Sequence, residues 1–177
     1  MHIQAGEATE PGRHAVSRKE HMTLPGALSI DPSSYVDPHG FVFREDHTLF
    51  RAIYDGSADF YRELIVSKLA DRLTREFGLV GTEISERSLP DLGCRLVLKH
   101  EAVEPATYPV EWCPSMLYDA ARLHLDLSLE LAAHGMMLQD AYPWNVRFAG
   151  TRPVFIDFTS VVPADPCMLW PAYDQFQ

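Results

Sequence analysis

The segment between Pro114 and Gly135 constrains the fold more than any other part of the sequence, because its twenty residues contain no internal glycine or proline. Proline suits the first turn of a helix and glycine suits the position just after its end, so the two residues delimit one long helix. Residues 123–131 alternate between leucine and polar side chains, which is also the pattern of a strand. The length of the segment and the alanine pairs on both sides of this run favour a helix.

The leucines of this helix fall on two faces. At 100° per residue, Leu123, Leu127 and Leu131 share one face. Leu125 and Leu129 lie roughly opposite them. A helix with two apolar faces is usually buried on two sides, so we expect this one at the centre of a helical subdomain.

The rest of the chain predicts a mixture of short strands and one further helix, and therefore an α+β fold. Apolar residues at helical spacing predict a single helix from Ser57 or Asp59 to about Phe77, with Gly78 as its C-terminal cap. Short apolar runs bounded by polar turns predict strands, and the first two of these form a β-hairpin. The predicted strands are residues 40–44, 48–54, 80–84, 94–100, 146–148 and 153–156.

Composition separates the N-terminal residues from the remainder. Residues 1–34 are rich in Gly, Pro, Ser, Thr, His and charged residues and show neither helical nor strand periodicity, which predicts a flexible extension. Residues 35–177 carry the hydrophobic patterns and are predicted to form one folded module, since a chain of 177 residues has room for one domain of ordinary size.

Charge and cysteine content exclude several classes of function. Fifteen Lys and Arg face 25 Asp and Glu, and a net charge of −10 disfavours partners such as nucleic acid or an anionic membrane. No apolar run approaches the roughly 18 residues of a membrane span, and the N-terminus lacks the apolar core of a secretory signal. Three scattered cysteines are typical of reduced thiols. We therefore expect a cytoplasmic protein.

Three polar residues stand in apolar surroundings after the long helix. They are Asp140, then Asn145 five residues later, then Asp157 at the end of the second strand of a predicted hairpin. Burying such groups is costly unless they have hydrogen-bond partners or a cation. In phosphoryl transfer a loop Asp orients the attacking hydroxyl, and an Asn and a second Asp hold Mg²⁺. The pattern thus predicts Asp140 as a catalytic residue and Asn145 and Asp157 as metal ligands; the alternative is that all three cap turns and a strand end.

These segments resemble a known group of enzymes. Residues 138–145 (LQDAYPWN) and 152–158 (RPVFIDF) are similar to the catalytic and metal-binding segments of protein-kinase-like small-molecule kinases, such as aminoglycoside phosphotransferases. The resemblance implies a kinase-like fold, with a small hairpin-plus-helix lobe at about residues 36–104 and a partial helical lobe that carries the catalytic-loop β-hairpin. It also implies Mg²⁺ and ATP as cofactors. Arg51 would replace the strand lysine that contacts phosphate, with Glu63 as its partner.

A closer resemblance is to the N-terminal part of bacterial class I SAM-dependent methyltransferases, a group that includes nodulation-related proteins. It extends over about residues 35–177 and implies that a methyl-transfer domain, with SAM as its cofactor, follows Gln177. The chain would then be a substrate-recruiting or regulatory module whose partner is a small-molecule substrate or its own C-terminal domain. The segments that carry the resemblance are residues 37–43 (DPHGFVF), 108–112 (YPVEW), 138–145 and 170–176 (WPAYDQF).

The sequence departs from the kinase pattern in the segments that would bind the nucleotide and its phosphates. No two glycines stand two residues apart, so a glycine-rich phosphate loop is missing. Gln139 and Thr159 occupy positions where the kinases usually have glycine. Two functions therefore remain open: a substrate-recruiting or regulatory module without phosphotransfer, and an Mg²⁺- and ATP-dependent phosphotransferase acting on a small hydroxyl substrate.

Overall fold

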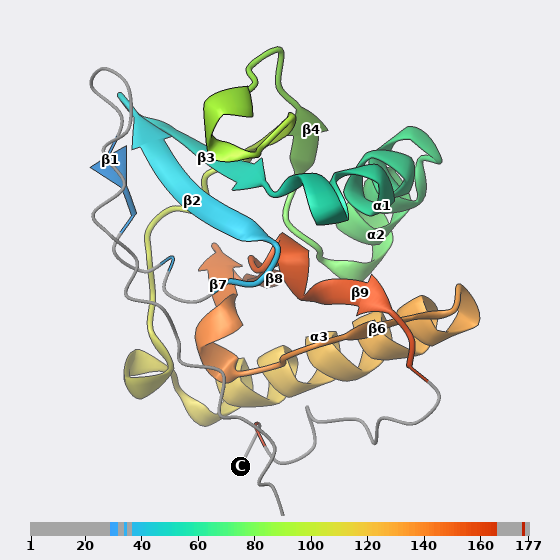
Figure 1. The fold of residues 1–177 in the computed structure, drawn as a ribbon. Helices are drawn as coiled ribbons and strands as arrows, with labels where there is room; N and C mark the ends of the chain where they lie inside the picture. Colours follow the sequence, from blue (N-terminus) through green and yellow to red (C-terminus); the bar gives the residue numbers. More distant parts are fainter. Residues whose placement is uncertain (1–28, 32–33, 35–36, 166–174, 176–177) are drawn as a thin grey trace, which may run out of the picture.

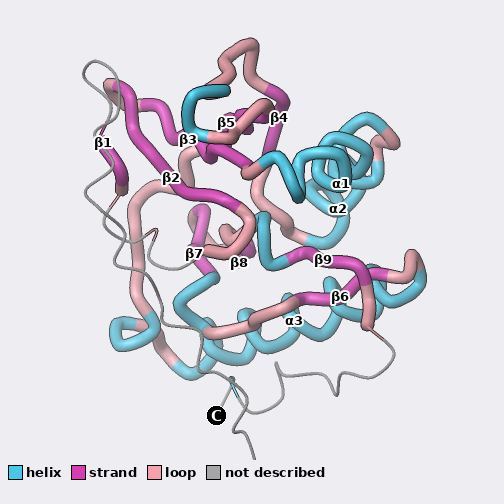
Figure 2. Tube along the Cα trace, in the orientation of Figure 1, coloured by secondary structure: helices cyan, strands magenta, loops and turns pink. Residues whose placement is uncertain are grey.

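The structure, a computed structural model, describes residues 29–31, 34, 37–165 and 175. Most of the expected extension at residues 1–34 lies outside this range, as does the motif at 170–176 apart from Gln175. Helices and sheets are both present, which confirms an α+β fold (Figures 1 and 2). A five-stranded sheet lies above the long helix α3 in Figure 1, with a small β-hairpin between them.

The five-stranded sheet is antiparallel, with the order β1-β2-β3-β5-β4. Its β2–β3 hairpin is the one expected from the sequence, with Val42 opposite Arg51. Ordered structure begins before residue 35, because β1 pairs with β2 and Asp31 forms an ion pair with Arg44. The strands are β1 (Ser29–Ile30), β2 (Gly40–Glu45), β3 (Thr48–Ile53), β4 (Thr82–Ile84) and β5 (Leu96–His100).

Two helices follow β3, so the prediction of a single helix here was wrong. Helix α1 (Asp55–Val66) ends when the N–H groups of Ser67 and Lys68 return to carbonyls of the last turn, and Lys68 adopts a left-handed conformation with φ of 65°. Helix α2 (Leu69–Phe77) then starts in a new direction and ends at Gly78, as expected. Both helices turn leucines towards the same core, which is why apolar spacing continues across the break.

Helix α3 (Pro114–Ala133) is one continuous helix, as predicted, and Gly135 follows it with φ of 69°. Its predicted burial on two sides was wrong. Leu123, Leu127 and Leu131 are buried, whereas Leu125 is 50% exposed and Leu129 is 72% exposed. The helix lies at the lower edge of the ribbon, and among the described residues its main packing partners are α2, β6 and β8 (Figure 1).

Two small antiparallel pairs follow α3. Strands β7 (Val146–Ala149) and β8 (Arg152–Phe155) form the expected hairpin. Strands β6 (Met136–Leu138) and β9 (Val161–Pro163), which the sequence patterns did not indicate, pair with each other. The stretch 139–160 is therefore a loop closed at its base, and it contains all three polar residues singled out above. In the part of the chain that the structure describes, no helix has the length and apolar character needed to cross a membrane.

One apolar core joins the sheet, the helices and the hairpin. The turn after α2 contributes to this junction, because the N–H of Val80 donates to the carbonyl of Phe155 at 2.9 Å and the N–H of Phe155 donates to Gly78 at 2.8 Å. Phe155 is fully buried and lies edge-on against the ring of His124 in α3. Backbone bonds to the turn after α2 and ring packing against α3 thus fix the end of β8, just before Asp157.

Candidate functional site

A cavity of about 430 Å³ lies where the loop at residues 139–160 faces strands β2 and β3. Four of the five predicted site residues line it, and Glu63 does not. Its polar lining comes from three parts of the chain: the turn before β2, strand β3 and the closed loop. The charged residues that line it are Asp37, Arg51, Asp140, Arg147 and Asp157.

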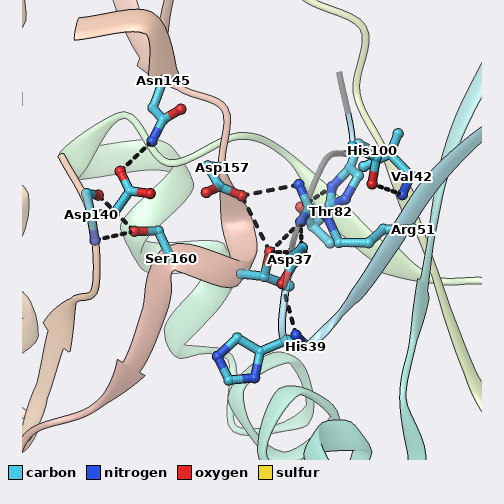
Figure 3. Close-up of polar contacts among 12 residues, drawn as sticks. Asp37, His39, Val42, Arg51, Thr82, His100, Asp140, Asn145, Asp157 and Ser160 are labelled. Carbon is cyan, nitrogen blue, oxygen red and sulfur yellow. Dashed lines mark hydrogen bonds and ion pairs between the residues drawn. The ribbon is translucent and has the colours of Figure 1, made fainter. Parts of the chain in front are cut away.

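Asp140 and Asn145 form a pair on one side of the cavity. The Asn145 side-chain amide donates to Asp140 Oδ1 at 3.0 Å (Figure 3). Two backbone bonds hold the pair in place: Ile156 N–H donates to the Asn145 carbonyl at 2.8 Å, and Asp140 N–H donates to the Ser160 hydroxyl at 2.9 Å. The Ser160 hydroxyl itself donates to the Asp140 carbonyl at 2.6 Å. The loop therefore closes on itself around this pair.

The environment of Asp140 favours its protonated form. Partial burial is the main cause that raises its pKa, and the negative charge of Asp157 raises the pKa further. Hydrogen bonds from the Tyr142 backbone and the Asn145 amide act in the opposite direction.

Arg51 joins the sheet to the closed loop. Its Nη2 donates to Asp157 Oδ1 at 3.0 Å, and its Nη1 contacts both the Asp37 carboxylate and the Thr159 hydroxyl (Figure 3). The Arg51 side chain is only 10% exposed. Hydrogen bonds between charged groups are stronger than neutral ones, so this contact fixes the position of β3 relative to Asp157.

The predicted pair between Arg51 and Glu63 was wrong. Helix α1 turns Tyr61 and Leu64 inward, and Glu63 is exposed on its outer surface. Tyr61 reaches the site instead: its hydroxyl donates to the Thr159 carbonyl at 2.8 Å and is fully buried. The carboxylate partners of Arg51 are instead Asp37, from the turn before β2, and Asp157, from the closed loop.

Sequence reasoning missed Asp37, His39 and Thr159. His39 connects two parts of the molecule, with Nδ1 2.9 Å from the Ser57 hydroxyl on α1 and Nε2 3.2 Å from Gln139 Oε1 in the closed loop. The available signal was the DPHG segment before β2, an Asp-Pro turn followed by glycine, which marks a fixed backbone position. The resemblance carried by this segment implies no role for it in the site.

Two partly exposed aromatic side chains, Tyr108 and Trp144, line the cavity. Tyr108 is 43% exposed and Trp144 is 54% exposed, and their ring centroids lie 6.0 Å apart. The Arg147 guanidinium covers the Tyr108 ring at 4.4 Å from its centroid and donates to the Thr107 carbonyl at 2.7 Å.

The metal-ligand role of Asn145 and Asp157 stays a prediction. Both residues line the cavity, but Asp157 Oδ1 already accepts from Arg51, and the Thr159 hydroxyl lies 3.2 Å from it. Among the described residues, no group of three or more His, Cys, Asp or Glu side chains is placed as metal ligands would be.

His100 lies at the end of β5, close to Arg51, and is 5% exposed. Its Nδ1 is 2.9 Å from the Thr82 hydroxyl, and its Nε2 has no hydrogen-bond partner among the described residues. Burial, and secondarily the positive charge of Arg51, lower the pKa of His100 to about 3. The imidazole is therefore neutral in the folded protein at neutral pH.

This burial of His100 predicts acid sensitivity. The unfolded chain takes up a proton on His100 near pH 6.5 and the folded chain does not, so stability falls as pH decreases from 6.5 towards 3. The expected loss is about 1.4 kcal/mol per pH unit from this group. Burial also lowers the pKa of His124, which acts in the same direction. Urea unfolding at pH 7.5, 6.5 and 5.5 should show a steeper loss for the wild type than for His100→Gln; parallel curves would contradict the assignment.

Comparison with known proteins gives a match over most of the chain. No family model matches the chain. Nodulation protein NoeA of Rhizobium meliloti (strain 1021) is 36% identical over 146 residues, which is 81% of this chain and 30% of NoeA. The expected likeness to a nodulation-related protein is confirmed, while the kinase-like and methyltransferase assignments stay predictions. The chain spans about 30% of the length of this curated relative, and it is similar over most of its own length to part of a bacterial nodulation protein.

Proposed function

We propose that residues 35–177 form a kinase-like module that binds a small polar molecule in the cavity and recruits it for a longer, methyltransferase-type protein. The observation that carries this proposal is the convergence of Arg51, Asp140, Asn145 and Asp157 on one cavity from separate elements. The order of elements supports the kinase-like part: a strand with a cation, a helix, a long helix, an Asp-x-x-x-x-Asn loop, a hairpin and an Asp. Methyl transfer and SAM would belong to a part of such a protein outside these residues.

The lining of the cavity suits a small molecule. Ligand sites combine apolar and aromatic walls with a few fixed polar groups, and this cavity has both. The Asp140 carboxylate accepts hydrogen bonds, and the Asn145 amide beside it offers a donor and an acceptor. Hydroxyl and amine groups match such a pair. We also propose a cytoplasmic setting, which the scattered cysteines support.

The second candidate is an Mg²⁺- and ATP-dependent phosphotransferase for a small hydroxyl substrate. The raised pKa of Asp140 favours it, because a carboxyl group of higher pKa is a better proton acceptor at neutral pH. Asp140 would orient the hydroxyl, and Asn145 and Asp157 would hold the metal. The residues present do not fit a triphosphate, however. Both Nη atoms of Arg51 are already bonded to carboxylates, and the sequence has no glycine-rich loop.

A thermal-shift screen against small amines, polyols, amino acids and Mg-ATP tests the proposal. We expect at least one polar compound to raise the melting temperature of the wild type and to lose this effect in Asp140→Asn and Asn145→Ala. Glu63→Ala is the matched control, since Glu63 is exposed on α1 away from the cavity, and it should respond like the wild type.

Calorimetry with Mg-ATP separates the two candidates. We expect affinity no better than about millimolar, roughly −4 kcal/mol, and no turnover. Micromolar binding that disappears in both Asn145→Ala and Asp157→Ala would favour the phosphotransferase instead. If compounds shift wild type and Asp140→Asn equally, the cavity is not the binding site.

A further inference from the structure

A carboxylate of the chain itself lies against the arginine of the cavity. Asp37 contacts Arg51 Nη1, and its side chain is 15% exposed. Its Oδ1 accepts the His39 backbone N–H at 2.8 Å, and its Oδ2 accepts the Thr159 hydroxyl at 2.8 Å. Asp37 thus sits among three donors, an arrangement that would equally suit an oxygen of a bound anion.

The backbone holds Asp37 in this position. Gly40 follows the turn, and a Cβ at Gly40 would overlap the carbonyl oxygen of Ala52 in β3. The chain therefore lies directly on β3, next to Arg51, and only glycine permits this approach. The N–H of Tyr54 donates to the His39 carbonyl at 2.8 Å and extends the hairpin to the turn. Asp37 is placed by the sheet and is not a loosely attached surface residue.

The charges of the cavity add up to a negative value. Asp37 and Asp157 both contact Arg51, and Asp140 and Arg147 complete the charged lining. Three carboxylates against two guanidinium groups give a formal charge of −1 if Asp140 is ionised. Free arginine binds phosphate and carboxylate through two parallel hydrogen bonds, but here chain carboxylates already take both Nη atoms. Arg51 is about nine-tenths buried, and its Nε has no hydrogen-bond partner among the described residues.

We propose that Asp37 determines the charge of the ligand that this cavity accepts. Its carboxylate occupies the face of Arg51 that would otherwise bind a soluble anion. The cavity therefore excludes phosphates and carboxylates and takes a polar ligand without negative charge. This inference names the ligand class of the cavity and so rests on the function proposed above.

Replacing Asp37 by asparagine tests the inference through a gain of binding. Asparagine keeps the size of the side chain and one acceptor oxygen for the His39 N–H, but it removes the charge and the second acceptor. Inorganic pyrophosphate, titrated calorimetrically without metal, is expected to bind Asp37→Asn at least tenfold more tightly than the wild type, which corresponds to about 1.4 kcal/mol. Asp37→Glu keeps the carboxylate and should exclude pyrophosphate as the wild type does. The double variant Asp37→Asn, Arg51→Gln should lose the gain.

Circular dichroism and melting temperature establish that each variant is folded, and Asp37→Ser is the second uncharged variant if Asp37→Asn is not. The inference is overturned if wild type and the uncharged variant bind pyrophosphate equally, or if the gain survives without Arg51. The proposed function fails separately, when no uncharged or cationic compound distinguishes wild type from Asp140→Asn. If the uncharged variant gains no pyrophosphate binding but the thermal-shift screen finds a ligand, the proposed role of Asp37 is wrong and the proposed function stands.

Discussion

Replacing Arg51 by alanine is expected to destabilise the protein by about 3–5 kcal/mol, the range for removing one partner of a buried ion pair. The physical reason is the pair of carboxylates left behind. Asp37 and Asp157 approach the same guanidinium from opposite segments, with side chains that are 15% and 27% exposed. Without Arg51 the two negative charges repel each other with most of their surface buried. Guanidinium chloride unfolding at pH 7, followed by circular dichroism, measures the loss.

Arg44 provides the matched control for this experiment. It lies on the neighbouring strand of the same hairpin and also pairs with an aspartate, Asp31, at 2.8 Å, but its side chain is 56% exposed. Water screens the exposed Arg44 guanidinium, although Asp31 is 12% exposed, so Arg44→Ala should cost clearly less than Arg51→Ala. Equal losses for the two variants would show that Arg51 does not have the buried, two-carboxylate environment described here.

Truncating Leu127 to alanine is expected to cost about 2–5 kcal/mol, as for other fully buried leucines. Leu127 has no exposed surface and lies in the middle of α3, where the helix faces the core shared with the sheet and the hairpin. Removing the side chain loses its apolar contacts and leaves a cavity in this core. Urea unfolding at pH 7 gives the free-energy difference directly.

Leu129, two residues further along the same helix, is the control for this prediction. It is 72% exposed, and alanine and leucine have similar helix propensity, so Leu129→Ala should stay within about 0.5 kcal/mol of the wild type. A loss from Leu129→Ala as large as that from Leu127→Ala would mean that the outer face of α3 is also packed, as the leucine pattern alone suggested.

Local patterns in the sequence correctly predicted those helices and strands whose ends are marked by proline, glycine or a polar turn. Pro114 and Gly135 delimit α3, and the turns of the β2–β3 and β7–β8 hairpins separate short apolar runs. The same patterns could not predict features that depend on how the elements pack against one another. The apolar spacing of α1 and α2 is continuous across the break at Lys68, and the leucines of α3 do not reveal that one of its two apolar faces is left exposed.

The same distinction applies to the candidate site: some of its residues could be predicted from local sequence, and others depend on long-range packing. Asp140, Asn145 and Asp157 stand close together in the sequence and in apolar surroundings, so their meeting at one cavity could be anticipated. The partners of Arg51 could not, because Asp157 is 106 residues away and the Asp37 turn depends on how β2 lies against β3. The pairing of Glu63 with Arg51 was implied by the kinase resemblance, and the exposure of Glu63 follows from which face of α1 meets the core.

The closure of the loop by β6 and β9 has a consequence for how the protein folds. Contacts within residues 136–163 join positions near each other in the chain, so little entropy is lost when this unit closes. Arg51 reaches Asp157 across 106 residues, and contacts of such separation form late. Until then Asp157 lacks its contact with Arg51. Docking of the sheet forms this contact, and we therefore expect the last long-range contact of folding and the completion of the cavity to be one event.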